Sequence, residues 1–236
     1  MVFSHSETIL KTSVYVDGYN LYYSRLKGTP WKWLDLGHLF AAEILHQQDP
    51  CTKLEQLSYF TAPIKASYAR HGQESNASQT QYHRALAAMH PSLLKIVEGF
   101  HIFHPTALPL FEPDRDPSKA RQAKVWMLEE KQTDVNLALH AYRDAISGQF
   151  DQVVICSNDS DIEPALKMIR EDAPLVRIGL VTPLHPPPHS KSVPNQRLVK
   201  LAHWVRGHIR DEELAKAQMP ERVATKKKPA IKPAYW

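Results

Sequence analysis

The stretch TSVYVDGYNLYY, residues 12–23, decides how this chain is expected to fold. Its run Val-Tyr-Val is made of β-branched and aromatic side chains, which favour a β-strand. The run ends at Asp17, where an Asp-Gly pair indicates a turn, and a helix is expected to follow from about Asn20. The stretch therefore predicts a strand that carries a carboxylate at its end and leads directly into a helix.

A second stretch, FDQVVICSNDSDIEPALKMIRE over residues 150–171, has the same organisation. The apolar run VVIC predicts a buried strand, and a helix is expected to begin near Ile162, with Pro164 in its first turn, where proline is tolerated. Asp159 and Asp161 lie in the turn between them. Because both strands continue into helices, they are expected to run parallel, and ligands bind beyond the carboxyl ends of such strands.

Seven further segments have the periodicity of regular structure. They predict, in chain order, a helix over 33–46, a strand over 54–64, a helix over 75–91, a strand or hairpin over 93–105, a helix from near Asp134 to residue 146, a strand over 175–183 and a helix or helix pair over 196–217. Strands alternate with helices, which predicts an α/β fold with a mostly parallel sheet.

Two proline-rich segments interrupt this alternation. Residues 105–119 contain four prolines without periodicity and are expected to form a loop, as are residues 183–195. Residues 218–236 are polar and basic, and they are expected to form a flexible tail. The sequence therefore predicts one domain over residues 1–217 followed by a basic tail.

The composition of the 236 residues is that of a globular protein, with 43% hydrophobic and 23% charged residues. The net charge of +4 permits a polyanionic partner without requiring one. Neither a signal peptide nor an apolar run of about 20 residues is present, so no membrane partner is expected. Cys51 and Cys156 have no disulfide or zinc spacing. We expect a cytoplasmic protein, and a homodimer stays open.

Asp17, Asp159 and Asp161 are expected to meet at one edge of the sheet. Carboxylates this close repel one another unless protons or a cation neutralise them, and oxygen-only ligands favour Mg²⁺ or Mn²⁺ over zinc. The alternative for Asp159 or Asp161 alone is to cap the helix that follows. Two neighbouring strand ends that both carry acids favour a metal site over capping alone.

The segments VYVDGYN, EEKQTDVNLALHAY and VVICSNDSDIEPALKMIRE, in this order and spacing, resemble the NYN family of nuclease domains, which is related to the PIN and FLAP-nuclease superfamily. The resemblance covers about residues 12–183. It implies a Rossmann-like, PIN-type three-layer α/β/α fold with a mostly parallel sheet. It also implies a metal-dependent ribonuclease that uses Mg²⁺ or Mn²⁺ and acts on RNA, which the aromatic residues suggest is single-stranded.

The resemblance assigns roles to individual residues. Asp17 matches the acid after the first strand, and Asn20 matches the asparagine of the D-x-x-N turn. Lys131 and Asp134 match the K-x-x-D segment that opens the central helix. Asp134 is alternatively an N-cap near the positive end of the helix dipole, and Lys131 steers phosphate or pairs with Glu130.

The turn after the second strand matches the family's S-x-D-S-D motif through Asp159 and Asp161. Asn158 stands where glycine is common, and asparagine fits a tight turn because it tolerates positive φ. Asn158, Ser157 and Ser160 are expected to bind the substrate, and the two serines alternatively stabilise the turn. The resemblance implies a catalytic set of Asp17, Asn20, Asp134, Asp159 and Asp161. The four aspartates of this set are the implied metal ligands.

A site with four carboxylates repels phosphate, so basic residues are expected to border it. The candidates are Arg25, Lys27, Lys32, Lys65, Arg70, Arg84, Arg115, Lys119, Arg121 and Lys124. Tyr19, Tyr22, Tyr23, Trp31 and Trp33 follow the first acid, and they either stack on unpaired bases or pack in the core. The basic tail either contacts the RNA backbone or only aids solubility.

Two other functions compete with a ribonuclease. A phosphatase of the haloacid-dehalogenase type also places an aspartate at a strand end, but it needs a D-x-D-x-T segment where this chain has D-G-Y-N. A catalytically silent module would use the acidic pocket to bind metal for structure while it binds RNA or recruits a partner. The presence of all four acids favours the enzyme.

Overall fold

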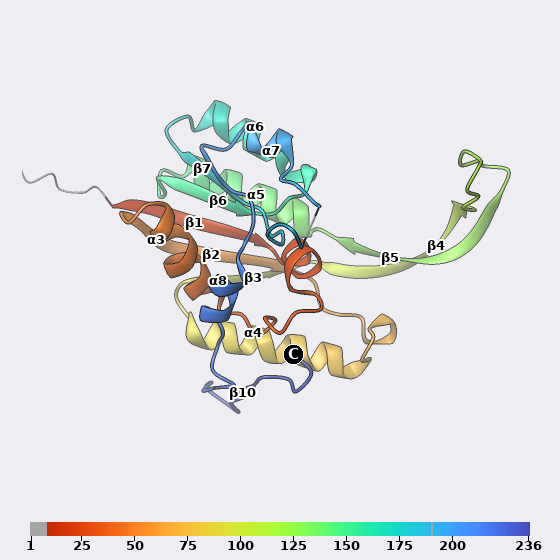
Figure 1. The fold of residues 1–236 in the computed structure, drawn as a ribbon, viewed down its shortest axis with the longest axis horizontal. Helices are drawn as coiled ribbons and strands as arrows, with labels where there is room; N and C mark the ends of the chain where they lie inside the picture. Colours follow the sequence, from red (N-terminus) through yellow and green to blue (C-terminus); the bar gives the residue numbers. More distant parts are fainter. Residues whose placement is uncertain (1–8, 190) are drawn as a thin grey trace, which may run out of the picture.

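The computed structural model describes residues 9–189 and 191–236, and its centre is a six-stranded parallel sheet (Figure 1). The strand order is β3-β2-β1-β6-β7-β8, and every neighbouring pair is parallel. The strands are β1 (Leu10–Asp17), β2 (Thr52–Thr61), β3 (Leu94–Glu98), β6 (Gln152–Cys156), β7 (Arg177–Val181) and β8 (Trp204–Arg206).

Helices cover both faces of the sheet (Figure 1). One layer contains α1 (Gly18–Leu21), η1 (Tyr22–Leu26), the consecutive α2 (Leu36–His38), η2 (Leu39–Leu45) and α3 (His46–Gln48), then α4 (Gln73–Met89) and α8 (Asp211–Lys216). The other layer contains α5 (Thr133–Ile146), η4 (Ser160–Ile162), α6 (Glu163–Asp172) and α7 (Gln196–Val199). A short helix, η3 (Ala66–Tyr68), precedes α4.

Alternation along β1 divides its side chains between two cores, because successive residues of a strand point to opposite faces. Val14 and Val16 are buried with the residues of the α4 layer. Tyr15, between them, is buried with the residues of α5 and α6. The predicted three-layer α/β/α fold with a mostly parallel sheet is confirmed.

The prediction of a loop over residues 105–119 is wrong in part. Residues 105–109 belong to β4 (Phe100–Pro109), which pairs antiparallel with β5 (Gln122–Lys131) to form an arm that projects from the body (Figure 1). In a two-stranded ribbon both strands are edges, and edges tolerate prolines because no ladder hydrogen bond is needed outward. Residues 183–189 and 191–195 contain no helix or strand, as predicted.

The prediction of a helix or helix pair over 196–217 is also wrong in part, because β8 lies between α7 and α8 and extends the sheet. Trp204 holds this strand against the sheet. Its indole Nε1 donates to the Gln152 side chain at 2.8 Å, and its ring fills the space that a side chain at Gly179 would occupy.

Residues 218–236, expected to be a flexible tail, pack against the α4 layer. They contain a small ladder of β9 (Arg222–Val223) and β10 (Ala230–Ile231), in which Val223 and Ala230 are buried. The fully buried Trp33 donates to the carbonyl of Pro220 at 2.8 Å, and its ring lies 6.1 Å from that of Trp236. Trp33 is therefore a core residue and not a base-stacking one.

None of the helices described in residues 9–189 and 191–236 has the length and apolarity needed to cross a membrane.

Deleting residues 222–236 is expected to lower the free energy of unfolding by about 3 kcal/mol, because Val223, Ala230 and the packing around Trp33 are lost. Thermal unfolding followed by circular dichroism measures the loss. The control replaces Lys226, Lys227 and Lys228 together by alanine. These side chains are exposed, so their loss changes the net charge without changing the packing. Equal stability of the truncated and full-length chains would show that the segment is not part of the core.

Candidate active site

The site begins where β1 and β6 end side by side. Val16 lies opposite Cys156 in the parallel ladder, so the next residues, Asp17 and Ser157, lie side by side at the carboxyl ends of the two strands. Ser157 Oγ donates to Asp17 Oδ2 at 2.9 Å, and both residues are buried. The other oxygen of Asp17 accepts from the backbone N–H of Asn20 at 2.8 Å and caps α1. Asp17 is therefore fixed by two donors.

The turn after β6 is organised by the same serine. Ser157 Oγ accepts from the backbone N–H of Asp159 at 3.0 Å. Asp159 Oδ1 in turn accepts from the backbone N–H of Asp161 at 3.0 Å and caps η4. Asp17 and Asp159 thus both serve as helix caps. Only one oxygen of Asp159 is used in this way among the described residues, so capping leaves the other oxygen for a ligand.

Asn20 and Asn158 connect the two turns with each other and with the proline-rich loop. Asn20 Oδ1 accepts from the backbone N–H of Asn158 at 3.0 Å. The Asn158 side chain donates to the carbonyl of Val193 at 3.2 Å and accepts from the backbone N–H of Asn195 at 2.7 Å. Asn158 was expected to tolerate positive φ, but Gln132 is the one described non-glycine residue with positive φ. The presence of asparagine at position 158 is therefore explained by the hydrogen bonds of its side chain and not by its backbone conformation.

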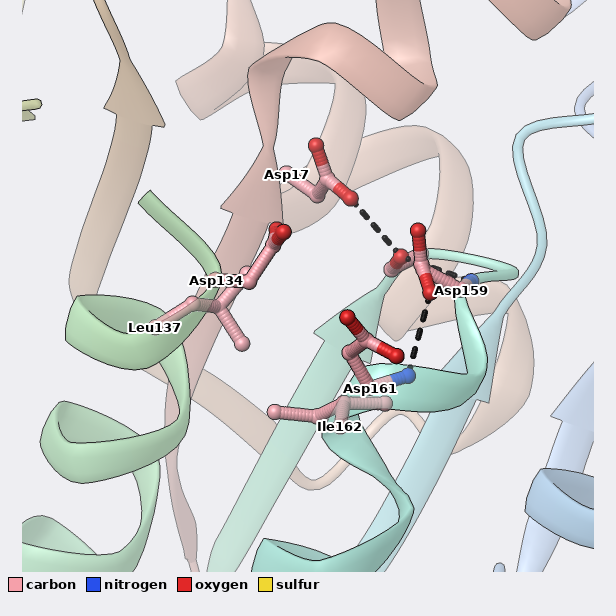
Figure 2. Close-up of a pocket in the computed structure, with 7 residues that line it drawn as sticks. Asp17, Asp134, Leu137, Asp159, Asp161 and Ile162 are labelled. Carbon is pink, nitrogen blue, oxygen red and sulfur yellow. Dashed lines mark hydrogen bonds between the residues drawn. The ribbon is translucent and has the colours of Figure 1, made fainter. Parts of the chain in front are cut away.

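Asp134 enters the site from the first turn of α5. The cap position belongs to Gln132, with a φ of 80°, so Asp134 is not the N-cap. Glu130 provides a hydrogen-bond acceptor for the start of α5 instead. Its Oε1 accepts from the backbone N–H of Thr133 at 3.1 Å. The Asp134 carboxylate makes no hydrogen bond or ion pair with another described residue and is oriented toward Asp17 (Figure 2).

The four aspartates surround one pocket, as Figure 2 shows. Ser157 lines it beside them, and Leu137 and Ile162 supply its apolar wall. Its volume of about 10 Å³ is that of a single water-sized body. Three separate segments of the chain, after β1, at the start of α5 and after β6, therefore bring four carboxylates to the carboxyl edge of the sheet.

The comparison with known proteins identifies the fold family. Residues 11–197 match the NYN domain. The chain belongs to the NYN domain family. NYN domains are PIN-like nuclease domains, and nucleases of this type generally use divalent metals.

One relative of this NYN domain protein is 6-hydroxy-3-succinoylpyridine 3-monooxygenase HspA of Pseudomonas putida. The two are 44% identical over 241 residues, which cover 96% of this chain and 75% of the relative. A crystal structure of a Vibrio parahaemolyticus protein of unknown function is a distant structural match, with 15% identity and a TM-score of 0.49 over 89% of this chain and 98% of that one.

The crowding of carboxylates in this NYN domain changes their acidity. Burial is the largest cause that raises the pKa of Asp17, the charge of Asp159 adds to it, and the donors Asn20 and Ser157 oppose it. The pKa of Asp134 is raised to about 6, first by burial and then by the charges of Asp17, Asp159, Glu130 and Asp161. Asp134 is exposed, yet all the charged groups that shift the pKa of its carboxylate are negative.

The donor chemistry of the pocket fits a hard divalent cation, because every charged ligand atom is a carboxylate oxygen. The carboxylates do not converge on one point, however. Across residues 9–189 and 191–236, no three acidic, histidine or cysteine side chains are grouped closely enough to hold an ion. Like charges hold such side chains apart, so an ion would have to draw the exposed Asp134 and Asp161 inward.

Several predicted residues lie outside the pocket. Lys131 pairs with Glu129 and not with Glu130, because residues two apart share one face of β5. Ser160 is exposed and does not line the pocket. Arg25 is fully buried, where it donates to the carbonyl of Ile209 at 2.7 Å, and therefore does not contact substrate.

Sequence reasoning missed three residues of the site. Glu130 accepts a hydrogen bond from the first residue of α5 and raises the pKa of Asp134, while Leu137 and Ile162 form the pocket wall. Glu130 had a weak signal in the sequence, since it is an acid just before the helix that carries Asp134. Leu137 and Ile162 had none beyond their apolar character, because a wall residue is recognised only once the helices are placed.

Replacing Asp134 by asparagine is expected to stabilise the metal-free protein at about pH 7.5 by roughly 1 kcal/mol, after a discount for solvent exposure, or about 2–4 °C in Tm. A raised folded-state pKa means that stability is complete below the ordinary value of 3.8 and is lost as the pH rises through about 6. Asparagine imitates the protonated carboxyl, so the gain should vanish below about pH 4.

Thermal unfolding in EDTA across this pH range measures the effect. Asp116→Asn, in the exposed turn of the arm, is the control and should show no such gain. A destabilised Asp134→Asn protein at neutral pH would contradict the repulsion described here.

Proposed function

We propose that this NYN domain protein is a metal-dependent ribonuclease that cleaves RNA phosphodiester bonds. Mg²⁺ or Mn²⁺ would be held by Asp17, Asp134, Asp159 and Asp161. The observation that carries the proposal is the pocket itself, which four aspartates from three chain segments line and in which Asp134 has no positive partner among the described residues. Uncompensated negative charge of this kind favours a bound cation.

The aspartates would bind the ion in different ways, because some are held in place and others are free to turn. Asp17 is buried and held by Ser157 and Asn20, so it supplies a fixed oxygen. Asp134 and Asp161 are exposed and can turn toward an ion or toward the water molecules around it. A bound divalent cation would lower the pKa of a water molecule and offset charge that develops on the phosphate.

Asn20 would act as a positioning residue that orients Asp17 and the turn at Asn158, and it would not contact the substrate. Its backbone N–H is used by Asp17, and its side-chain oxygen is used by the backbone of Asn158. Ser157 would have a similar task, because it contacts both Asp17 and Asp159. Lys131 would at most attract phosphate from a distance, since it is already paired with Glu129.

A second candidate function comes from the relative named as a 6-hydroxy-3-succinoylpyridine 3-monooxygenase, with which the chain shares 44% identity. A monooxygenase transfers one atom of O₂ to its substrate and reduces the other to water with two electrons from a donor such as a nicotinamide. The pocket residues favour hydrolysis over this reaction. Non-haem iron oxygenases typically combine two histidines with one carboxylate, and none of the described histidines lines this pocket.

Asp17→Asn and Asp159→Asn are expected to reduce Mn²⁺-dependent cleavage of single-stranded RNA by more than about 100-fold, because each removes a charge from the ligand set. The folded state should survive, as both asparagines can still accept the capping hydrogen bonds. Gel analysis of a labelled oligoribonucleotide, with Mn²⁺ and with EDTA, measures cleavage. Asp172→Asn, at the far end of α6 from the site, is the matched control and should cleave normally.

Three outcomes would contradict the proposal in different ways. Full activity in either site variant would indicate a contaminating nuclease. RNA binding without cleavage in any metal would favour a catalytically silent module. Consumption of O₂ and a nicotinamide with 6-hydroxy-3-succinoylpyridine, without RNA cleavage, would favour the monooxygenase.

A further inference from the structure

A row of aromatic rings begins beside the acidic pocket. Tyr19 stands two residues after Asp17, and its ring stacks on that of Tyr23 with centroids 6.1 Å apart and an angle of 11° between the planes. On its other side, Tyr19 meets His101 of β4, with a hydroxyl-to-Nε2 distance of 3.0 Å and ring centroids 5.7 Å apart. His101 Nδ1 lies 3.0 Å from the carbonyl of Pro63, which fixes the ring.

The row continues along one face of the β4–β5 arm. Phe103 lies two residues beyond His101 and therefore on the same face. Its ring meets that of Tyr68, at 5.7 Å between centroids. Pro105 comes next on this face, and Trp126 of β5 is directly opposite it in the ladder, so the two side chains share that face. Tyr68 and Trp126 are each 69% exposed.

We call this row the aromatic track: Tyr23, Tyr19, His101, Phe103, Tyr68 and Trp126. It connects the turn that carries Asp17 with the projecting arm.

Positive charges accompany the track. Lys27 Nζ lies 4.9 Å from the ring centroid of Tyr23, and Lys124 shares the face of the arm with Trp126, two residues away. Glu130 is the acid among the ladder residues of this face, and it lies opposite His101 at the end next to the pocket. The outer part of the track is therefore aromatic and positive.

The opposite face of the arm has another chemistry. Along its length this face exposes the aliphatic side chains Ile102, Leu108 and Val125, and its exposed phenyl ring, Phe100, lies where the arm joins the body. Aromatic rings that are exposed together on one surface are typical of an interaction site. Aromatic rings interleaved with lysines are the surface that proteins present to single-stranded nucleic acid, whose bases stack while its phosphates meet the cations.

We propose that the aromatic track binds the single-stranded RNA substrate and leads it from the arm to the acidic pocket. This inference rests on the proposed ribonuclease function and names the surface that such an enzyme would use. Unpaired bases stack on the most exposed rings, Trp126 and Tyr68 on the arm and Tyr23 near the pocket. Phosphates meet Lys124 and Lys27. A duplex buries its base faces and is excluded from these contacts.

The test is the binding of a fluorescein-labelled oligouridylate to the full-length protein, followed by fluorescence anisotropy in EDTA so that no cleavage intervenes. Trp126→Ala and Tyr23→Ala are each expected to weaken binding by about 5- to 150-fold, the range for loss of one stacked base. Trp126→Phe should retain most of the affinity. Lys124→Gln should reduce the slope of log affinity against log salt concentration by about 0.7.

Val125→Ala is the matched control, because it alters the neighbouring residue on the opposite face of the same strand. It should bind like the wild-type protein. An equal loss in Val125→Ala, unchanged affinity in Trp126→Ala and Tyr23→Ala, or no RNA binding by the wild-type protein would each overturn the inference. So would an oligomer that Trp126→Ala dissociates without any change in RNA affinity, since the arm would then be a protein interface.

These results can be separated from those on the proposed activity. Track-dependent binding without cleavage in any metal would refute the ribonuclease and leave the track standing. Cleavage that tolerates both alanine variants at wild-type affinity would refute the track and leave the ribonuclease standing.

Discussion

The parallel pairing of β1 with β6 is the constraint on which the rest of the site depends. Because Val16 lies opposite Cys156, Asp17 and Ser157 emerge at the same edge, within hydrogen-bonding distance of each other. A change of one residue in that register would point Asp17 to the other face of the sheet. The Asn20–Asn158 hydrogen bond then holds the two turns together.

Placing acids at this edge has an electrostatic cost that shapes the site. Two aspartates use one oxygen each to cap helices, so capping and ligand binding are compatible roles of the same side chain. Asp134 has no such partner among the described residues, and its pKa rises to about 6 among its acidic neighbours. A cation bound among these acids would replace repulsion by attraction.

The sequence predicts the parts of this protein that depend on local signals. Two β-branched runs that end in aspartates predict the sheet edge, whereas Asp134 came only from the family resemblance. The missed parts depend on tertiary contacts. Trp204 forms a strand because Gly179 leaves room for its ring, and the C-terminal segment is ordered because it covers Trp33. Lys131 was expected to act in a helical turn, but it ends a strand and pairs with Glu129.

The most direct test of a single four-aspartate cation site is anomalous diffraction from crystals soaked with Mn²⁺. The account predicts one or two peaks in the pocket, within about 2.0–2.6 Å of carboxylate oxygens that include Asp17 and at least one of Asp134 and Asp161, which would have turned inward. Absence of any peak in the pocket at saturating Mn²⁺, with the aspartates in their present positions, would contradict it.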